Sequence, residues 1–192
     1  MTTVAQQAAG VARTVWQLDP AHTTVEFSVR HMMVARVRGR FTAVRGTVEL
    51  DEQDVTRSVV EVAIDASTID TGQPQRDAHL RSPDFLDVEH HPEIRFRSRR
   101  IEPLGEGRYR VVGDLTIRGV AREVALEVEE TGRTRDPWGN DRIGYVARTA
   151  INRHDWGVSW NQLLEAGGVV VGDEVKIEIE GELMRAAAQQ AA

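Results

Sequence analysis

Apolar and polar residues alternate in many short stretches of the chain between residues 16 and 184. In the clearest stretch, Val25, Phe27, Val29 and His31 share one parity, while the other parity carries acidic, hydroxyl and basic side chains. Alternation with a period of two is typical of strands that turn one face away from water. The stretch therefore predicts a strand whose dry face carries a single titratable group, His31.

The same alternation recurs often enough to predict an all-β protein. We expect strands near residues 16–19, 23–34, 37–50, 57–66, 93–102, 108–118, 121–132, 142–152 and 173–184. Glycines between several of these stretches permit the tight connections that hairpins need. Many strands without a long helix between them indicate an antiparallel barrel or sandwich, and they are numerous enough to close a barrel of about eight strands.

Two longer connections interrupt the pattern. Residues 70–92 predict an excursion with a short helix near 75–81 and a turn after it, and a second irregular stretch runs over 152–172. Both connections carry large apolar residues, namely Phe85, Leu86, Trp156, Trp160, Leu163 and Leu164. These side chains either plug one end of the barrel or contact a ligand, and the sequence leaves both alternatives open.

Length and apolar content narrow the class of protein. The chain has 192 residues, which is enough for one sizeable core. We predict a flexible leader at 1–15, a single domain at 16–185 and a tail at 186–192. No stretch approaches the roughly 20 consecutive apolar residues of a transmembrane helix, and the leader lacks the pattern of an export signal. We therefore expect a cytoplasmic protein without a transmembrane segment.

Charge and cysteine content exclude further classes. The formal net charge is -6, and the chain contains no cysteine. Nucleic-acid binders gain most of their affinity from clustered cations, so we expect no nucleic-acid partner. Without cysteine there are no disulfides, no thiolate metal sites and no thiol catalysis.

The inward parity of the predicted strands is mostly small and aliphatic, and aromatic residues make up only 5% of the chain. A wide barrel would therefore have few bulky side chains to fill its centre. Barrels of about eight strands are either filled by side chains or hold one small ligand, and composition does not choose between the two. An apolar and elongated lumen, if present, would suit an extended hydrocarbon chain.

Two groups of polar residues are candidates for ligand recognition. His31 would point into the interior, either to bond a ligand headgroup or to rest as a core histidine bonded to the protein. The nearby Arg36, Arg38, Arg40 and Arg45 would either meet a phosphorylated headgroup at the barrel mouth or lie on a solvated strand face. The sequence leaves all four alternatives open.

Metal and catalytic sites are not expected. His79, Asp84, His90 and His91 are zinc-compatible in type, but adjacent histidines in an extended segment point to opposite faces. Asp77 is expected to support the short helix instead. The chain has no G-x-S-x-G elbow and no glycine-rich phosphate loop, so we predict neither a metal site nor an enzyme.

Four blocks of sequence together resemble the YceI-like family of polyisoprenoid-binding proteins. The blocks read DPAHTTVEFSVRHMMVARVRGRF at 19–41, DAHLRSPDFLDVEHHPEIRFRS at 77–98, GDLTIRGVAREVALEVE at 113–129 and HDWGVSWNQLLEAGGVVVGDEVKIEIEGEL at 154–183. The resemblance implies an extended, eight-stranded, lipocalin-like antiparallel barrel, with the short helix in the 70–92 excursion. It also implies a function in which the elongated pore holds a long isoprenoid or a similar amphiphile, with no established catalytic residue.

Two departures from the family limit what the resemblance implies. Several members carry a secretion signal, which the leader of this chain does not show. Trp156 takes the place of a phenylalanine common in the family, and the larger ring would narrow the pore.

We therefore predict a non-catalytic carrier of a long-chain isoprenoid, an isoprenoid quinone or a similar amphiphilic lipid, with no cofactor required. The predicted ligand contacts are Phe27, Val29, His31, Arg38, Phe41, Val62, Ile64, Phe85, Phe96, Leu115, Ile117, Tyr145, Trp156 and Trp160. Two alternatives stay open at this point. One is a filled barrel that acts as an interaction module and forms a homodimer, and the other is an enzyme that acts on a bound lipid.

Overall fold

The computed structural model describes residues 13–165 and 167–187, which are mostly strand. The strands are β1 (Thr14–Leu18), β2 (Thr24–His31), β3 (Ala35–Phe41), β4 (Val44–Leu50), β5 (Val59–Asp65), β6 (Ile69–Asp70), β7 (Glu93–Gly105), β8 (Arg108–Ile117), β9 (Val120–Arg135), β10 (Asp141–Asn152) and β11 (Val171–Arg185). The α-helix α1 (Pro74–Arg81) and the short 3-10 helices η1 (Val55–Arg57), η2 (Ala66–Thr68) and η3 (Arg153–Trp156) lie in the connections.

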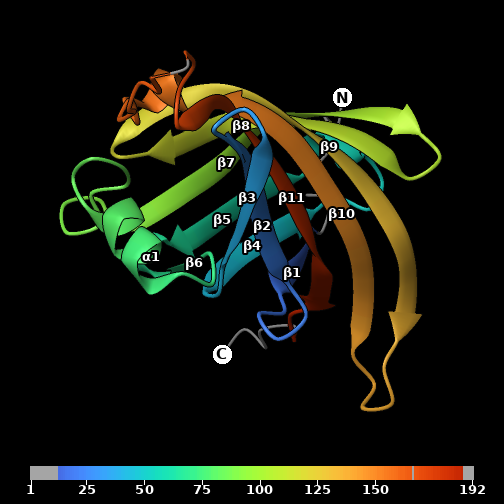
Figure 1. Cartoon of the computed structure of the whole chain (residues 1–192). Coiled ribbons are helices and arrows are strands. Elements are labelled where there is room, and N and C mark those ends of the chain that lie inside the picture. Colours follow the sequence, from blue (N-terminus) through green and yellow to red (C-terminus); the bar gives the residue numbers. More distant parts are fainter. Residues whose placement is uncertain (1–12, 166, 188–192) are drawn as a thin grey trace, which may run out of the picture.

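A closed antiparallel barrel of eight strands forms the centre of the molecule (Figure 1). Its strands follow the order β1-β4-β5-β7-β8-β9-β10-β11, and β11 returns to pair with β1. Closure removes the free edges that an open sheet would expose. The predicted all-β barrel is therefore confirmed.

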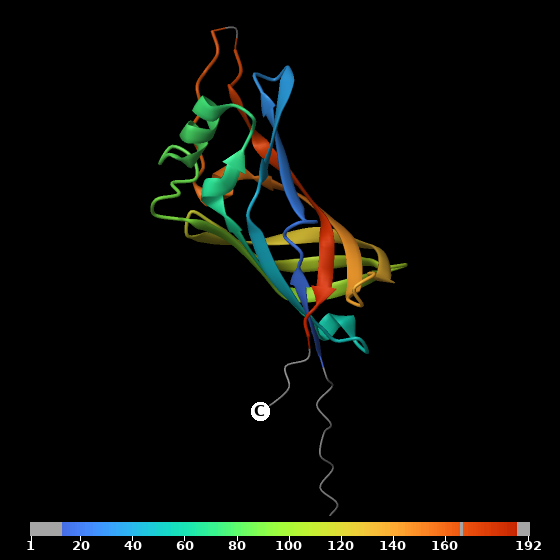
Figure 2. The same cartoon turned by 90° about the horizontal axis from the view of Figure 1, so that it is seen from below.

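The strands β2, β3 and β6 extend the barrel wall at one end. β2 pairs with the first part of β11, β3 pairs with β2, and β6 pairs with β3. The single strand predicted over 37–50 is in fact two strands, because the backbone amides of Thr42 and Ala43 donate to the Thr68 hydroxyl at 3.2 Å instead of a sheet partner. Figure 2 shows the β2–β3 hairpin at the opposite end of the molecule from β1 and the end of β11.

The helix α1 covers one side of this extended end. It begins at Pro74, close to the predicted position, because proline fits the first turn of a helix. Asp77 accepts hydrogen bonds from the Thr71 amide at 3.0 Å and from the Thr71 hydroxyl, so it joins the helix to the preceding loop as expected. The ring of His79 meets the rings of Phe85 and Trp160 edge to face, at 5.0 and 4.7 Å. The two long connections thus pack on each other.

Parts of the predicted leader and tail lie outside the described residues, which begin at 13 and end at 187. Within the described part, β1 already begins at Thr14, before the predicted start of the domain. None of the described helices combines the length and the apolar character that a bilayer span requires.

Candidate ligand-binding site

A cavity of about 430 Å³ runs inside the barrel. Sites for small ligands in proteins typically enclose roughly 300 to 1,000 Å³, so this space is large enough to hold a guest. Every strand of the barrel contributes to its wall, and β2, β3, β6 and α1 add to it. The cavity therefore belongs to the barrel itself and not to a surface loop.

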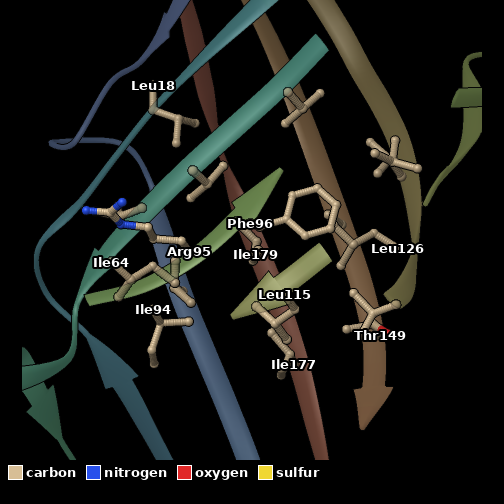
Figure 3. Close-up of a pocket in the computed structure, with 18 of the residues that line it drawn as sticks. Leu18, Ile64, Ile94, Arg95, Phe96, Leu115, Leu126, Thr149, Ile177 and Ile179 are labelled. Atoms are coloured by element: carbon tan, nitrogen blue, oxygen red, sulfur yellow. The ribbon is translucent and has the colours of Figure 1, made fainter. Parts of the chain in front are cut away.

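The wall of the cavity is almost entirely aliphatic and aromatic. Figure 3 shows Ile64 of β5, Phe96 of β7, Leu115 of β8 and Ile177 of β11 directed from different strands into the same space. Alternation explains this arrangement, because successive side chains of a strand point to opposite faces. The outward neighbours of these residues are charged or small, and the apolar face of each strand lines the lumen.

Most of the predicted contact residues lie in this wall. The cavity is lined by Phe27, Val29, Phe41, Val62, Ile64, Phe85, Phe96, Leu115, Ile117, Tyr145 and Trp156. Within residues 13–165 and 167–187, His31, Arg38 and Trp160 are not among the lining residues. The structure thus brings together most of the apolar residues of the predicted set, but it leaves His31 and Arg38 outside the cavity wall.

His31 does not enter the lumen as its parity predicts. It is half-buried and is the last residue of β2, opposite Val171 on β11. The turn that follows has left-handed backbone at Met32 and Met33, with φ of 47° and 60°, and it carries the chain away from the barrel. His31 therefore keeps its parity but lies beyond the cavity wall.

Arg38 and Trp160 also lie outside the cavity wall. Arg38 is exposed on β3 opposite Ser28, as expected for an arginine on a solvated strand face. Trp160 is half-buried and packs against His79 and Phe85. Of the loop residues proposed as plugs, Leu163 is 82% exposed and closes nothing.

Trp156 belongs to both the core and the cavity wall. Its side chain is 2% exposed, and its indole nitrogen donates to the Leu115 carbonyl at 2.9 Å. This bond fixes the ring where the 152–172 connection meets β8. A buried indole that is hydrogen-bonded in this way acts as a rigid part of the wall.

The buried guanidinium of Arg153 supports the same end of the barrel, a role that the sequence did not reveal. It is 5% exposed and donates to the carbonyls of Val158, Trp160, Val171 and Gly172 at 2.6 to 3.2 Å. Burial lowers the pKa of Arg153, and Asp173 at 3.8 Å opposes that effect only weakly. The bonds tie the 152–172 connection to the start of β11.

Two hydroxyl groups interrupt the apolar interior. The side-chain oxygens of Thr23 and Tyr145 are buried, and within the described part of the chain neither has a hydrogen-bond partner of normal geometry. Gly181 lies opposite Tyr145 on the sheet, and a side chain there would collide with the Thr23 hydroxyl at 2.5 Å. Burial raises the pKa of Tyr145 to about 12, and the nearby Thr23 hydroxyl partly offsets this. Tyr145 therefore keeps a neutral hydroxyl that is buried in the barrel wall beside Thr23.

The polar rim beside η1 is satisfied within the protein. Asp51 is 2% exposed, accepts from the amides of Gln53 and Asp54 at 3.1 and 3.0 Å, and pairs with Arg57 at 2.9 Å. Ser58 accepts from the Asp51 amide at 2.9 Å. These groups hold the β4–β5 connection in place, and they leave little capacity for a ligand.

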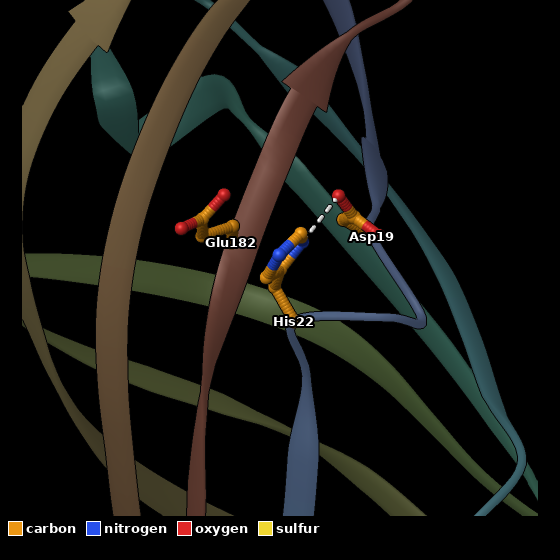
Figure 4. Close-up of side chains that lie close together, drawn as sticks. All are labelled: Asp19, His22 and Glu182. Atoms are coloured by element: carbon orange, nitrogen blue, oxygen red, sulfur yellow. Dashed lines mark hydrogen bonds and ion pairs between the residues drawn. The ribbon is translucent and has the colours of Figure 1, made fainter. Parts of the chain in front are cut away.

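A cluster of acidic groups lies outside the cavity, where β1 meets β2. Figure 4 shows Asp19, His22 and Glu182, whose ligand atoms lie within 4.8 Å of one another. The guanidinium of Arg142 already pairs with Asp19 at 2.7 Å and with Glu182 at 2.8 Å. A side-chain cation thus occupies the place that a metal ion would need, so we interpret the cluster as structural.

The four metal-type residues singled out in the sequence do not come together. His79 pairs with Asp84 at 2.8 Å, and His90 pairs separately with Asp87 at 2.9 Å. Over the described ranges the only close group of three such ligands is the one around Asp19. His79 contributes instead to the aromatic packing under α1.

Known proteins share this fold and much of this sequence. The chain is 35% identical to a UPF0312 protein of Staphylococcus aureus over 170 residues, which cover 88% of this chain and 96% of that protein. It is also 35% identical to a UPF0312 protein of Vibrio parahaemolyticus over 138 residues, or 72% of this chain and 73% of that one.

Solved structures agree with the barrel. BcnA of Burkholderia cenocepacia superposes with a TM-score of 0.75 at 23% identity, covering 88% of this chain and 99% of BcnA. A polyisoprenoid binding domain of Saccharophagus degradans gives a TM-score of 0.66 at 13% identity, covering 91% and 99%. The family model for the YceI-like domain matches residues 16–183. The chain therefore belongs to the YceI-like domain family.

Proposed function

We propose that this protein is a non-catalytic carrier that holds the tail of a long-chain isoprenoid, or of a similar amphiphilic lipid, inside its barrel. The observation that carries the proposal is the apolar cavity of about 430 Å³, which every strand of the barrel lines. Transfer of apolar surface from water contributes roughly 25 cal/mol per Å², so an apolar guest gains affinity along its whole length. The likeness to the polyisoprenoid binding domain of Saccharophagus degradans supports the same class of ligand.

A neutral polar group on the ligand fits this cavity better than a charged one. The three arginines among the lining residues are paired within the protein. Arg95 pairs with Glu93, Arg133 pairs with Glu52 and Glu130, and Arg153 donates to backbone carbonyls. An anionic headgroup inside the cavity would therefore have to compete with these partners, which is costly for a buried charge.

The two alternatives have less support. A filled barrel does not agree with the cavity. An enzyme acting on bound lipid would need acid and base groups that converge on the lumen, and His31, the candidate base, lies outside the wall. The cytoplasmic location and the homodimer stay predictions.

The first experiment identifies the guest. Native mass spectrometry of the protein purified from its own host, followed by solvent extraction, should reveal a bound amphiphile with a long apolar tail. Protein that is empty, and that also ignores added polyprenyl lipids, would contradict the carrier function.

The second experiment tests the lumen directly. Val62 is half-buried on β5 and lines the cavity, so Val62→Trp should fill the space and reduce lipid uptake at least tenfold. Glu61 is the exposed neighbour on the same strand, and Glu61→Trp adds the same bulk to the outer face. Uptake is measured with a fluorescent polyprenyl lipid. Equal uptake by the two folded variants would show that the ligand does not enter the barrel.

A further inference from the structure

The turn between β2 and β3 exposes three consecutive large apolar side chains. Met32, Met33 and Val34 are 41, 57 and 82% exposed, and we call them the methionine tip. The turn touches the 161–170 segment through a bond from the Met32 amide to the Val170 carbonyl at 2.9 Å. That segment exposes Leu163, so four of the seven exposed large apolar residues in the described ranges lie at this end (Figure 2).

The fold does not require methionines in this turn. Met32 and Met33 both have positive φ, where glycine or asparagine is favoured and a longer side chain is strained. Met33 still leaves more than half of its surface exposed, and Met32 leaves 41%. Exposed apolar residues on a strained turn are typical of a surface that is used for contact.

Three arginines lie directly behind the methionine tip. Arg30, Arg36 and Arg38 lie on the outward face of the hairpin, and we call them the arginine patch. Arg30 and Arg36 are direct cross-strand neighbours, an arrangement that is unfavourable for like charges. Among the described arginines, only these three and Arg108 make neither an ion pair nor a side-chain hydrogen bond.

The acidic groups around the patch are mostly occupied. Asp173 pairs with His154 at 2.8 Å, and Glu174 pairs with Lys176 at 3.8 Å. This leaves Glu165 on the neighbouring segment and Glu26, which lies opposite Arg40 on the hairpin. The chain as a whole has a net charge of -6, so a locally cationic hairpin stands out. The positive charge of the patch is therefore available to an anion outside the protein.

We propose that the methionine tip and the arginine patch form a docking surface for an anionic lipid bilayer. Apolar side chains insert into the interface while the arginines behind them meet the phosphates of anionic headgroups. Val29, close to the turn on β2, and Val171, opposite His31, line the cavity. Docking therefore brings one end of the lumen to the membrane, where an amphiphile would enter or leave. This route rests on the proposed function, whereas the docking surface does not.

The test measures sedimentation of the full chain with vesicles of phosphatidylcholine, alone or mixed with phosphatidylglycerol. The protein should bind only the mixed vesicles, and salt should weaken binding. Each arginine near an anionic surface is worth about fivefold in partition, so replacing Arg30, Arg36 and Arg38 by Gln should reduce binding about a hundredfold. Arg108→Gln removes an equally unpaired charge elsewhere and should change little.

A second pair of variants tests the apolar part. Met33→Ser combined with Val34→Ser keeps the charge and should reduce binding to the mixed vesicles roughly tenfold. Trp138 is also 82% exposed, but it lies in the β9–β10 turn, so Trp138→Ser should leave binding unchanged. Circular dichroism and lipid uptake verify that each variant is folded.

Three results would overturn the proposal. The first is absence of vesicle binding, and the second is equal binding to neutral and anionic vesicles. The third is a dimer that is lost when Met33 and Val34 are replaced while vesicles are ignored, which would assign the surface to a second copy of the chain. A protein that binds vesicles but carries no lipid would contradict the proposed function alone.

Discussion

The hairpins β2–β3 and β9–β10 project from different parts of the barrel (Figure 1). They differ in whether their charged side chains are paired within the protein. In the β9–β10 turn, Asp136 accepts hydrogen bonds from the amides of Trp138 and Asn140 at 3.0 and 2.9 Å, and from Arg142 at 2.8 Å. Arg142 also pairs with Asp19 and anchors the hairpin to the β1–β2 connection. The β2–β3 hairpin has no such network among its described residues.

The difference shows why exposure alone is a poor guide to function. Trp138 is as exposed as Val34, at 82%, but it is a single apolar side chain on a turn whose charges are satisfied internally. Scattered exposed apolar residues are normal on protein surfaces. Val34 instead lies beside other exposed apolar residues and in front of unpaired arginines. Of these two hairpins, β2–β3 is therefore the one that combines a group of exposed apolar side chains with unpaired arginines, the two features of a membrane-binding surface.

The largest effect on stability is expected from removing the centre of the β9–β10 network. Arg142→Gln leaves Asp19, Asp136 and Glu182 close together without their shared cation. The thermal midpoint should fall by several degrees, since breaking a network costs more than losing one surface pair. Differential scanning calorimetry measures the change, with Arg108→Gln as the unpaired control. Equal midpoints for the two variants would mean that the hairpins do not differ in the way described.

Acid should weaken the same network. Bonds from Arg142 and then from His22 lower the pKa of Asp19 from 3.8 to about 2. Burial opposes the shift of Asp136, but bonds from Asn140 and Arg142 outweigh it, so the pKa of Asp136 is also well below its usual value. In acid the unfolded chain therefore binds more protons than the folded chain. The stability that these carboxylates contribute is present above the unfolded pKa of 3.8 and is lost as the pH falls towards 2.

Hydrogen exchange locates this acid effect. Amide exchange at low pH should accelerate in the β9–β10 hairpin before it does in β2–β3, because the first hairpin depends on titrating carboxylates. Arg142→Gln has already lost the partner of these groups, so its stability should depend less steeply on pH over the same range. If the stability of the unmodified protein and that of Arg142→Gln fell equally steeply with pH, the bonds to Arg142 would not be the cause of the acid effect.

The sequence predicted the parts of the molecule that depend on local periodicity. The alternation of Val25, Phe27 and Val29 placed these side chains correctly on the inner face, and the prolines and glycines marked the turns and α1. The resemblance to the YceI-like family added closure of the barrel, which periodicity alone does not determine.

What the sequence did not predict depends on pairings between distant segments. Arg142 joins residues from β10, the β1–β2 connection and β11, and no local pattern brings these together. The buried hydroxyls of Thr23 and Tyr145 come from different segments, and the absence of a side chain at Gly181, opposite Tyr145, leaves room for Thr23. The parity of His31 was read correctly, but parity does not show where a barrel wall ends.

A smaller effect is expected from relieving the strained turn. Met33 has a φ of 60°, where a side chain with a β-carbon is unfavourable, so Met33→Gly should stabilise the protein by about 0.5 to 1 kcal/mol. Vesicle binding should fall at the same time, because the apolar side chain is lost. Glu106 has a φ of 52° in the β7–β8 turn, and Glu106→Gly should stabilise similarly without loss of vesicle binding. Denaturant unfolding and sedimentation separate the two effects.

The smallest effect sharpens the comparison most directly, because it places an acid within the arginine patch. Ser28 lies opposite Arg38 on β3 and opposite Lys176 on β11. Ser28→Glu should therefore stabilise the fold by about 0.5 kcal/mol through cross-strand attraction. It should also weaken binding to anionic vesicles about fivefold, since one positive charge of the patch is neutralised.

Ser28→Gln is the matched control, with nearly the same shape and no charge. If the arginine patch is cationic because it lacks internal partners, Glu should raise the unfolding midpoint above that of Gln and bind vesicles less well. A Glu variant that is no more stable than the Gln variant would mean that Arg38 and Lys176 do not sense the charge at position 28. If the Glu variant has a higher unfolding midpoint and weaker vesicle binding than the Gln variant, the unpaired positive charge of this hairpin lowers stability and promotes binding.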